Sequence, residues 1–158
     1  MTPMEPVGRD LVGRDLFFAN IATPADVRDL DLPPAHFVTL LVWNADGQST
    51  ETVAVVLEEL FARGASYLCA WGSDCERVHD IADEADAYPS DVASPDEAVR
   101  MTTWHAGEEL GETVDFFLRY TEPDAFYTRS TKASLVLCIG PEDLAAKTHQ
   151  LLRDGLRD

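Results

Sequence analysis

The chain has 158 residues, of which 46% are hydrophobic, and this is enough for one domain with a core of its own. Twelve basic residues face 29 acidic ones, and the net charge of −17 repels phosphate backbones and anionic lipid. No run of about 18 apolar residues occurs, and the first twenty residues do not resemble a secretion signal. We therefore expect no nucleic-acid partner and no membrane partner.

The first 34 residues predict an N-terminal arm with a short helix. They contain a tandem repeat, VGRDL at 7–11 and again at 12–16, which is too short a unit for a repeat protein. Thr23 and Pro24 are typical of a helix start, and the two prolines at 33–34 end that helix. We expect little of the function in this arm.

The next stretch predicts a strand, a helix and a second strand. Residues 36–43 (HFVTLLVW) are apolar on both faces, which is typical of a strand that is covered on both sides. Ser49 or Thr50 caps the helix that follows, and Gly64 ends it. Residues 66–71 (SYLCAW) predict the second strand.

The second half of the chain continues the alternation. Ser73 and Glu76 match a capping box at the start of the second helix. Residues 99–104 (VRMTTW) predict the third strand, and a helix opens at about Gly107 and Glu108. A fourth strand covers 134–139, and the last helix follows it with a proline in its first turn.

These elements predict an α/β fold, with an arm at 1–34 and a single domain at 35–158. Alternating strands and helices are typical of three layers, a mainly parallel sheet of about four strands with helices on both faces. Such a fold is flavodoxin-like or Rossmann-like, and we expect the strand order 2-1-3-4.

Three of the predicted strands end in tryptophan and are followed by polar loops. In open α/β sheets ligands bind at the carboxyl edge, near the point where the strand order reverses. With the order 2-1-3-4 that point lies between strands one and three. Core packing is the alternative role for the tryptophans. The predicted ligand-binding residues are Trp43, Asn44, Asp46, Trp71 and Trp104.

The loop and helix after the second strand carry the most reactive side chains. Cys75, His79 and Asp83 are spaced four apart and share a helix face, and the first-turn position of Cys75 favours a thiolate. His105 follows the third strand directly, with Glu108 close behind it. These residue types suit a thiolate–imidazole nucleophile or a divalent metal site. The predicted catalytic residues are Cys75, His79, Asp80, His105 and Glu108.

No motif indicates a particular cofactor, although a divalent metal is compatible with these residues. The sequence lacks the dinucleotide fingerprint, the Walker phosphate loop and the Gly-x-Ser-x-Gly elbow of hydrolases. Three cysteines, Cys69, Cys75 and Cys138, are an odd number, and two lie in strand-like runs. We expect free thiols in a reducing cytoplasm.

Charge and size favour an interaction protein over an enzyme. Nine acidic residues between Ser73 and Ala98 are accompanied by one basic residue, Arg77, which indicates a solvated face or a docking patch for a basic protein. The first hypothesis is a non-enzymatic interaction or regulatory module of the accessory or immunity type. The second is a small hydrolase or metal-dependent enzyme that uses the Cys/His/Asp/Glu group.

Two segments resemble a small bacterial family of uncharacterised domains. They are 69–80 (CAWGSDCERVHD) and 101–105 (MTTWH), and the similarity extends over roughly residues 35–140. The resemblance implies no mechanism, because the family has no established activity.

Overall fold

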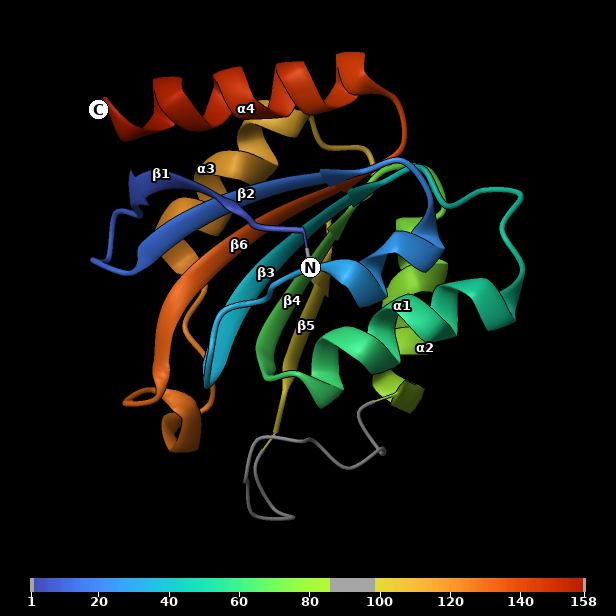
Figure 1. Cartoon of the computed structure of the whole chain (residues 1–158), viewed down its shortest axis with the longest axis horizontal. Coiled ribbons are helices and arrows are strands. Elements are labelled where there is room, and N and C mark those ends of the chain that lie inside the picture. Colours follow the sequence, from blue (N-terminus) through green and yellow to red (C-terminus); the bar gives the residue numbers. More distant parts are fainter. Residues whose placement is uncertain (1, 86–98, 158) are drawn as a thin grey trace.

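The computed structural model describes residues 2–85 and 99–157 and shows an α/β fold around one mixed sheet (Figure 1). Neighbouring strands are parallel except for the first two, so the predicted mainly parallel sheet is confirmed. In the described ranges the strand order is β1-β2-β6-β3-β4-β5. The strands are β1 (Glu5–Arg9), β2 (Asp15–Ile21), β3 (His36–Trp43), β4 (Ala65–Trp71), β5 (Met101–Trp104) and β6 (Thr131–Ile139).

The N-terminal segment belongs to the sheet, which corrects the predicted count of about four strands to six. β2 lies beside β6 in continuous parallel register, from Asp15 opposite Ala133 to Ile21 opposite Ile139. β1 contains Pro6 and pairs only with β2, at the edge of the sheet, where a proline is tolerated. The tandem repeat therefore forms the end of β1, the turn and the start of β2.

Helices pack against both faces of the sheet, over two separate clusters of buried apolar residues. The short 3-10 helix η1 (Pro24–Asp29), α1 (Thr50–Ala62) and α2 (Cys75–Ala85) cover one face, and α3 (Leu110–Tyr120) and α4 (Glu142–Leu156) cover the other. A second 3-10 helix, η2 (Ala125–Tyr127), precedes β6. All eight residues of β3 are buried, because this strand lies in the middle of the sheet between the two clusters. In the part of the chain that the structure describes, no helix could cross a membrane.

The helix boundaries follow local signals, with one correction. The Ser49 hydroxyl accepts the Thr52 N–H at 3.1 Å, as predicted for the start of α1. The predicted capping box at the start of α2 is wrong, because the helix begins one residue later and the Ser73 hydroxyl binds the side chains of Asn44 and Asp46 instead. β5 and α3 both begin two or more residues later than predicted, at Met101 and Leu110.

The predicted strand order is also wrong. The four predicted strands correspond to β3, β4, β5 and β6 and lie in the order 4-1-2-3 rather than 2-1-3-4. α1 and α2 connect strands on one face, whereas α3 returns on the other face, between β5 and β6. Since such connections are right-handed, crossings on opposite faces move the chain across the sheet in opposite directions. β4 and β5 are thus neighbours in the sheet. The helix after β4, α2, lies on one face, and the helix after β5, α3, lies on the other.

Candidate functional site

The three predicted tryptophans close β3, β4 and β5 at the carboxyl edge, but their environments differ. Trp43 is 3% exposed and packs in the core cluster of the α1 face. Trp71 is partly buried, and its Nε1–H donates to the Glu108 carbonyl oxygen at 3.0 Å. Trp104 is 44% exposed. Core packing therefore accounts for Trp43, whereas Trp104 is accessible at the surface.

Asn44 and Asp46 join the loop after β3 to the loop after β4. Asn44 Oδ1 accepts the backbone N–H of Ser73 at 2.8 Å, and the Ser73 hydroxyl also bonds to the Asp46 carboxylate. Gly72 permits this approach, because a Cβ atom there would lie 2.1 Å from the Trp43 carbonyl oxygen. These polar groups stabilise two loops.

His79 lies in a cluster that joins α2 to β5. Its ring centroid is 4.3 Å from that of Trp104, and its Nε2 is 3.4 Å from a carboxylate oxygen of Asp83. Asp83 also accepts the Thr102 hydroxyl at 2.8 Å. The other ring nitrogen, Nδ1, is buried and has no hydrogen-bond partner among the described residues. His79 thus packs against the Trp104 ring from the α2 side.

Cys75 begins α2 but points into the core. It is 2% exposed, so the residue that the sequence predicts as a nucleophile is not accessible at the surface. Cys69 and Cys138 are also buried, and all three thiols are free, as predicted. Burial raises the pKa of Cys69 to about 12 and that of Cys138 to about 11, so both thiols stay protonated at neutral pH.

His105 is held on the α3 side of the sheet. It is 6% exposed, and its two ring nitrogens lie 3.0 Å from Glu108 Oε2 and 3.0 Å from Thr103 Oγ1. The ring also contacts Phe116 of α3, with centroids 4.8 Å apart. The Glu108 carboxylate accepts a second hydrogen bond from the Thr113 hydroxyl at 3.3 Å. The predicted pair of His105 and Glu108 is therefore brought together, at the start of α3.

The two predicted histidines lie on opposite faces of the sheet. Thr103 and Trp104 are consecutive residues of β5, and consecutive strand side chains point to opposite faces. Thr103 contacts His105 on the α3 side, and Trp104 contacts His79 on the α2 side. Among the residues with described positions, no group of three or more His, Cys, Asp or Glu side chains is placed to hold a metal ion. The predicted residues thus form two clusters and not one centre.

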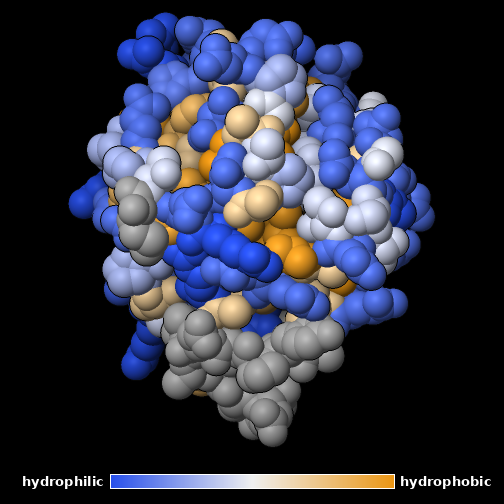
Figure 2. Space-filling model, turned by 45° about the vertical axis from the view of Figure 1, so that its right-hand side comes forward, coloured by the Kyte–Doolittle hydropathy of each residue, from blue (hydrophilic) through white to orange (hydrophobic). Residues whose placement is uncertain are grey.

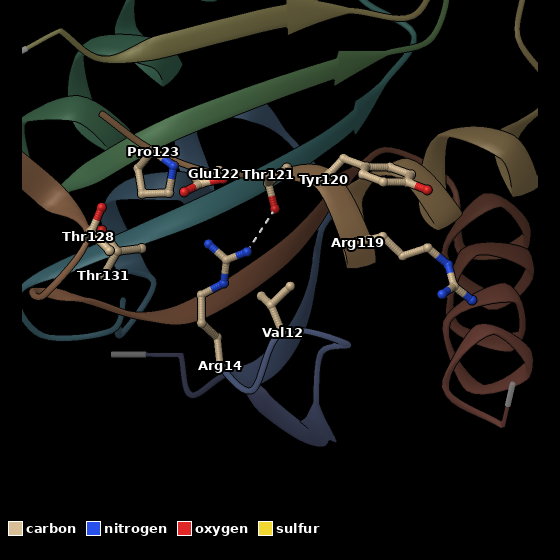
Figure 3. A pocket seen from close by; sticks show the side chains of 9 residues that line it. All are labelled: Val12, Arg14, Arg119, Tyr120, Thr121, Glu122, Pro123, Thr128 and Thr131. Carbon is tan, nitrogen blue, oxygen red and sulfur yellow. Dashed lines mark hydrogen bonds between the residues drawn. The ribbon is translucent and has the colours of Figure 1, made fainter. Parts of the chain in front are cut away.

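Sequence reasoning missed a cavity at the opposite, amino edge of the sheet (Figure 3). Its volume is about 430 Å³, and it lies between the starts of β2 and β6 and the segment after α3. The Arg14 guanidinium points into it (Figure 3). Arg14 Nε lies 2.9 Å from Asp10 Oδ2, and Arg14 Nη2 donates to Thr121 Oγ1 at 3.1 Å.

Asp10 holds this arginine in place through a buried ion pair. Its side chain is fully buried, and its carboxylate accepts the backbone N–H groups of Val12 and Arg14, Arg14 Nε–H and the Ser134 hydroxyl. Each copy of the repeat supplies one member of the ion pair. The spacing of four residues between Asp10 and Arg14 is the feature of the sequence that could have indicated this ion pair.

Comparison with known proteins places the chain in a family. No curated protein matches it. A family model described as a domain of unknown function, DUF7684, matches residues 17–155. This range includes most of β2 and every later element except the last residue of α4, so it extends well beyond the two segments that carried the resemblance. The predicted membership of an uncharacterised family is confirmed: the chain belongs to the domain family of unknown function DUF7684.

Proposed function

We propose that this domain is a non-enzymatic interaction module that binds a basic segment of a partner protein. The binding site is the acidic α2–β5 surface, formed by Trp104 together with Asp80, Asp83 and Glu84. The observation that carries the proposal is an exposed tryptophan, packed on His79, beside the acidic side chains Asp80 and Glu84, which have no ion-pair partner among the described residues.

Trp104 has the properties of an interface anchor. It is 44% exposed on β5, the strand at which the described sheet ends. Its ring packs on His79, so little side-chain entropy remains to be lost on binding. Tryptophans of this kind often dominate the energy of an interface.

The acidic residues of α2 weaken the helix that carries them. Asp83 and Glu84 lie in its last turn, where the helix dipole disfavours negative charge, and Asp80 and Glu84 are like charges four residues apart. Neither Asp80 nor Glu84 has an ion-pair partner among the described residues. The one basic residue of α2, Arg77, binds Asp74 and the backbone of the loop after β3. A basic partner would supply the missing opposite charge.

Other features support the proposal. The candidates for an active centre are divided, because Cys75 is buried and His79 and His105 lie on opposite faces of the sheet. Three buried, unpaired thiols favour a reducing cytoplasm as the location of the protein. The acidic residues between 86 and 97, which the sequence groups with this surface, lie outside the described residues.

The test is calorimetric titration of the full chain with a nonapeptide in which lysines alternate with leucine and glycine. We expect binding that weakens with added salt. In Asp80→Asn/Glu84→Gln, and separately in Trp104→Ala, we expect a loss of affinity of about tenfold.

The matched control changes the same net charge on the opposite face, with Glu142→Gln/Asp143→Asn in α4. It should bind the peptide almost like the native chain. An equal loss in both double variants would show unspecific charge attraction and overturn the proposal, as would no binding to the native chain at low salt.

A further inference from the structure

The cavity at the amino edge contains an arginine with unused hydrogen-bonding capacity. The Arg14 side chain is only 10% exposed, and its Nε and Nη2 are bound to Asp10 and Thr121. The remaining nitrogen, Nη1, makes no hydrogen bond to a described residue, and it is not among the polar atoms sealed off from solvent. Arg14 is therefore fixed in place with N–H donors directed into an open cavity (Figure 3).

The residues that line the cavity around Arg14 have a net positive charge, whereas the whole chain is strongly negative. The cavity adjoins a second hollow of about 330 Å³, and the two share Val12, Arg14 and Thr131. Four basic and two acidic residues line them, in a chain with 12 basic and 29 acidic residues. They are Arg9, Arg14, Arg119 and Lys132 on one side and Asp15 and Glu122 on the other. A third of the positive charge of the chain lies here, which favours an anionic ligand.

Three of these cations, including Arg14 with Asp10, are already in ion pairs, and Lys132 is not. Arg9 lies 3.7 Å from Asp15, and Arg119 lies 2.8 Å from Asp115, both at partly or fully exposed positions. Lys132 has no ion-pair partner in the described ranges, and Arg14 keeps one free nitrogen. The Asp10 carboxylate offsets part of the Arg14 charge, but it is fully buried, accepts four hydrogen bonds and lines neither hollow, so a ligand would not contact it directly.

The lining of the cavity indicates the rest of the ligand. Val12, Tyr120 and Pro123 contribute apolar surface, and a volume of about 430 Å³ is in the range of small-molecule sites. The planar guanidinium matches the geometry of a carboxylate. Glu122 also lines the cavity and, with the net charge of −17, disfavours a ligand with several negative charges.

We infer that this cavity binds a small organic carboxylate, with its charged group at Arg14 and its apolar body against Val12 and Pro123. The site is independent of the acidic α2–β5 surface, because it lies at the opposite edge of the sheet. Experiments can therefore refute peptide binding at that surface and carboxylate binding in this cavity separately.

The experiment is an NMR titration of the full chain with benzoate, with its neutral analogue benzamide, and with inorganic phosphate. We expect benzoate to shift the signals of Val12 and of the Arg14 side chain in a saturable way, and benzamide and phosphate to do so much more weakly. If benzoate and benzamide shift these signals equally, the ligand is not recognised by its negative charge and the proposal is wrong. A stronger effect of phosphate would overturn the choice of a carboxylate.

Variants at the rim test the site without disturbing the buried ion pair. Glu122→Gln removes an opposing charge and should raise the benzoate affinity about two- to fivefold. Lys132→Gln should lower it by a similar factor. The only other lysine, Lys147 of α4, lines neither hollow, so Lys147→Gln is a matched control and should leave the affinity unchanged. Equal losses in the two lysine variants would overturn the proposal.

A double variant tests Arg14 itself. Arg14→Gln alone would leave Asp10 buried without its cation and could unfold the chain. Asp10→Asn/Arg14→Gln removes both charges, and benzoate binding should be lost while thermal unfolding remains cooperative. Retained binding in a folded double variant would show that Arg14 is not the contact.

Discussion

His36 is buried at the start of β3 in surroundings that favour its neutral form. It is 4% exposed, and its Nδ1 lies 2.6 Å from the Ser130 hydroxyl oxygen. Its Nε2 is buried and has no hydrogen-bond partner among the described residues, and its ring packs edge-on against Tyr127. Burial, and then the positive charge of Arg100, lowers the pKa of His36 below its usual 6.5.

This shift predicts a loss of stability in mild acid. Below pH 6.5 the unfolded chain binds a proton at His36 that the folded chain binds only at lower pH. The contribution of His36 is present above pH 6.5 and is lost as the pH falls towards the folded-state pKa, by at most about 1.4 kcal/mol per pH unit. Urea unfolding at pH 7.5, 6.5 and 5.5 should show this slope, and His36→Gln should flatten it. Parallel slopes for the two proteins would contradict the prediction.

The sequence identified reactive residues but could not show which ones meet. The spacing of Cys75 and His79 does predict neighbouring positions on α2, yet it does not say which side of the helix is buried. The side of β5 that His105 takes depends on the strand register, which brings Thr103 and not Trp104 towards α3. Asp10 and Arg14 were missed because charged residues in a repeat are normally exposed.

At the scale of elements, Gly72 controls how closely the loops after β3 and β4 approach. It has φ +126°, and a Cβ atom would lie 2.1 Å from a backbone oxygen of Trp43. Gly72→Ala should lower the free energy of unfolding by about 3 kcal/mol, because of the strained backbone and the clash with an atom that cannot move easily. Denaturant unfolding measures this loss.

A matched control is Gly47→Ala, in the loop after β3. This glycine also has a positive φ, of +81°, but its Cβ atom would meet no atom within 4 Å. We expect a cost of about 1 kcal/mol there, from the backbone alone. Similar costs at both sites would show that the approach of the two loops contributes little.

Elements with strong local signals were predictable, and their order was not. β3, β4 and β6 are apolar runs covered on both faces, so a continuous hydrophobic stretch identified them. β1 was missed because it is an edge strand with a proline, a glycine and mostly exposed side chains. The strand order depends on which face each connecting helix takes, and the sequence of α3 is compatible with either face.

At the scale of the molecule, the net charge of −17 predicts a stability that rises with salt. Like charges repel more in the compact state than in the unfolded chain. Raising the ionic strength from about 0.01 to 0.1 M shortens the Debye length from about 30 to 10 Å and screens this repulsion. The Tm should rise by several degrees between these conditions in a calorimetric scan. A Tm that falls with salt would show that attractive ion pairs outweigh the repulsion.

The duplicated VGRDL unit has a consequence for a chain that is shorter by one copy. Deletion of 7–11 and deletion of 12–16 give one and the same sequence, in which a single VGRDL runs directly into Phe17. In that shorter chain Glu5 stands four residues before the arginine, as Asp10 does before Arg14. Glu5 and Pro6, which belong to β1 in the native chain, would then stand where Asp10 and Leu11 stand in the turn. Loss of one copy would thus change the residues available for the edge strand and still keep the carboxylate–guanidinium spacing.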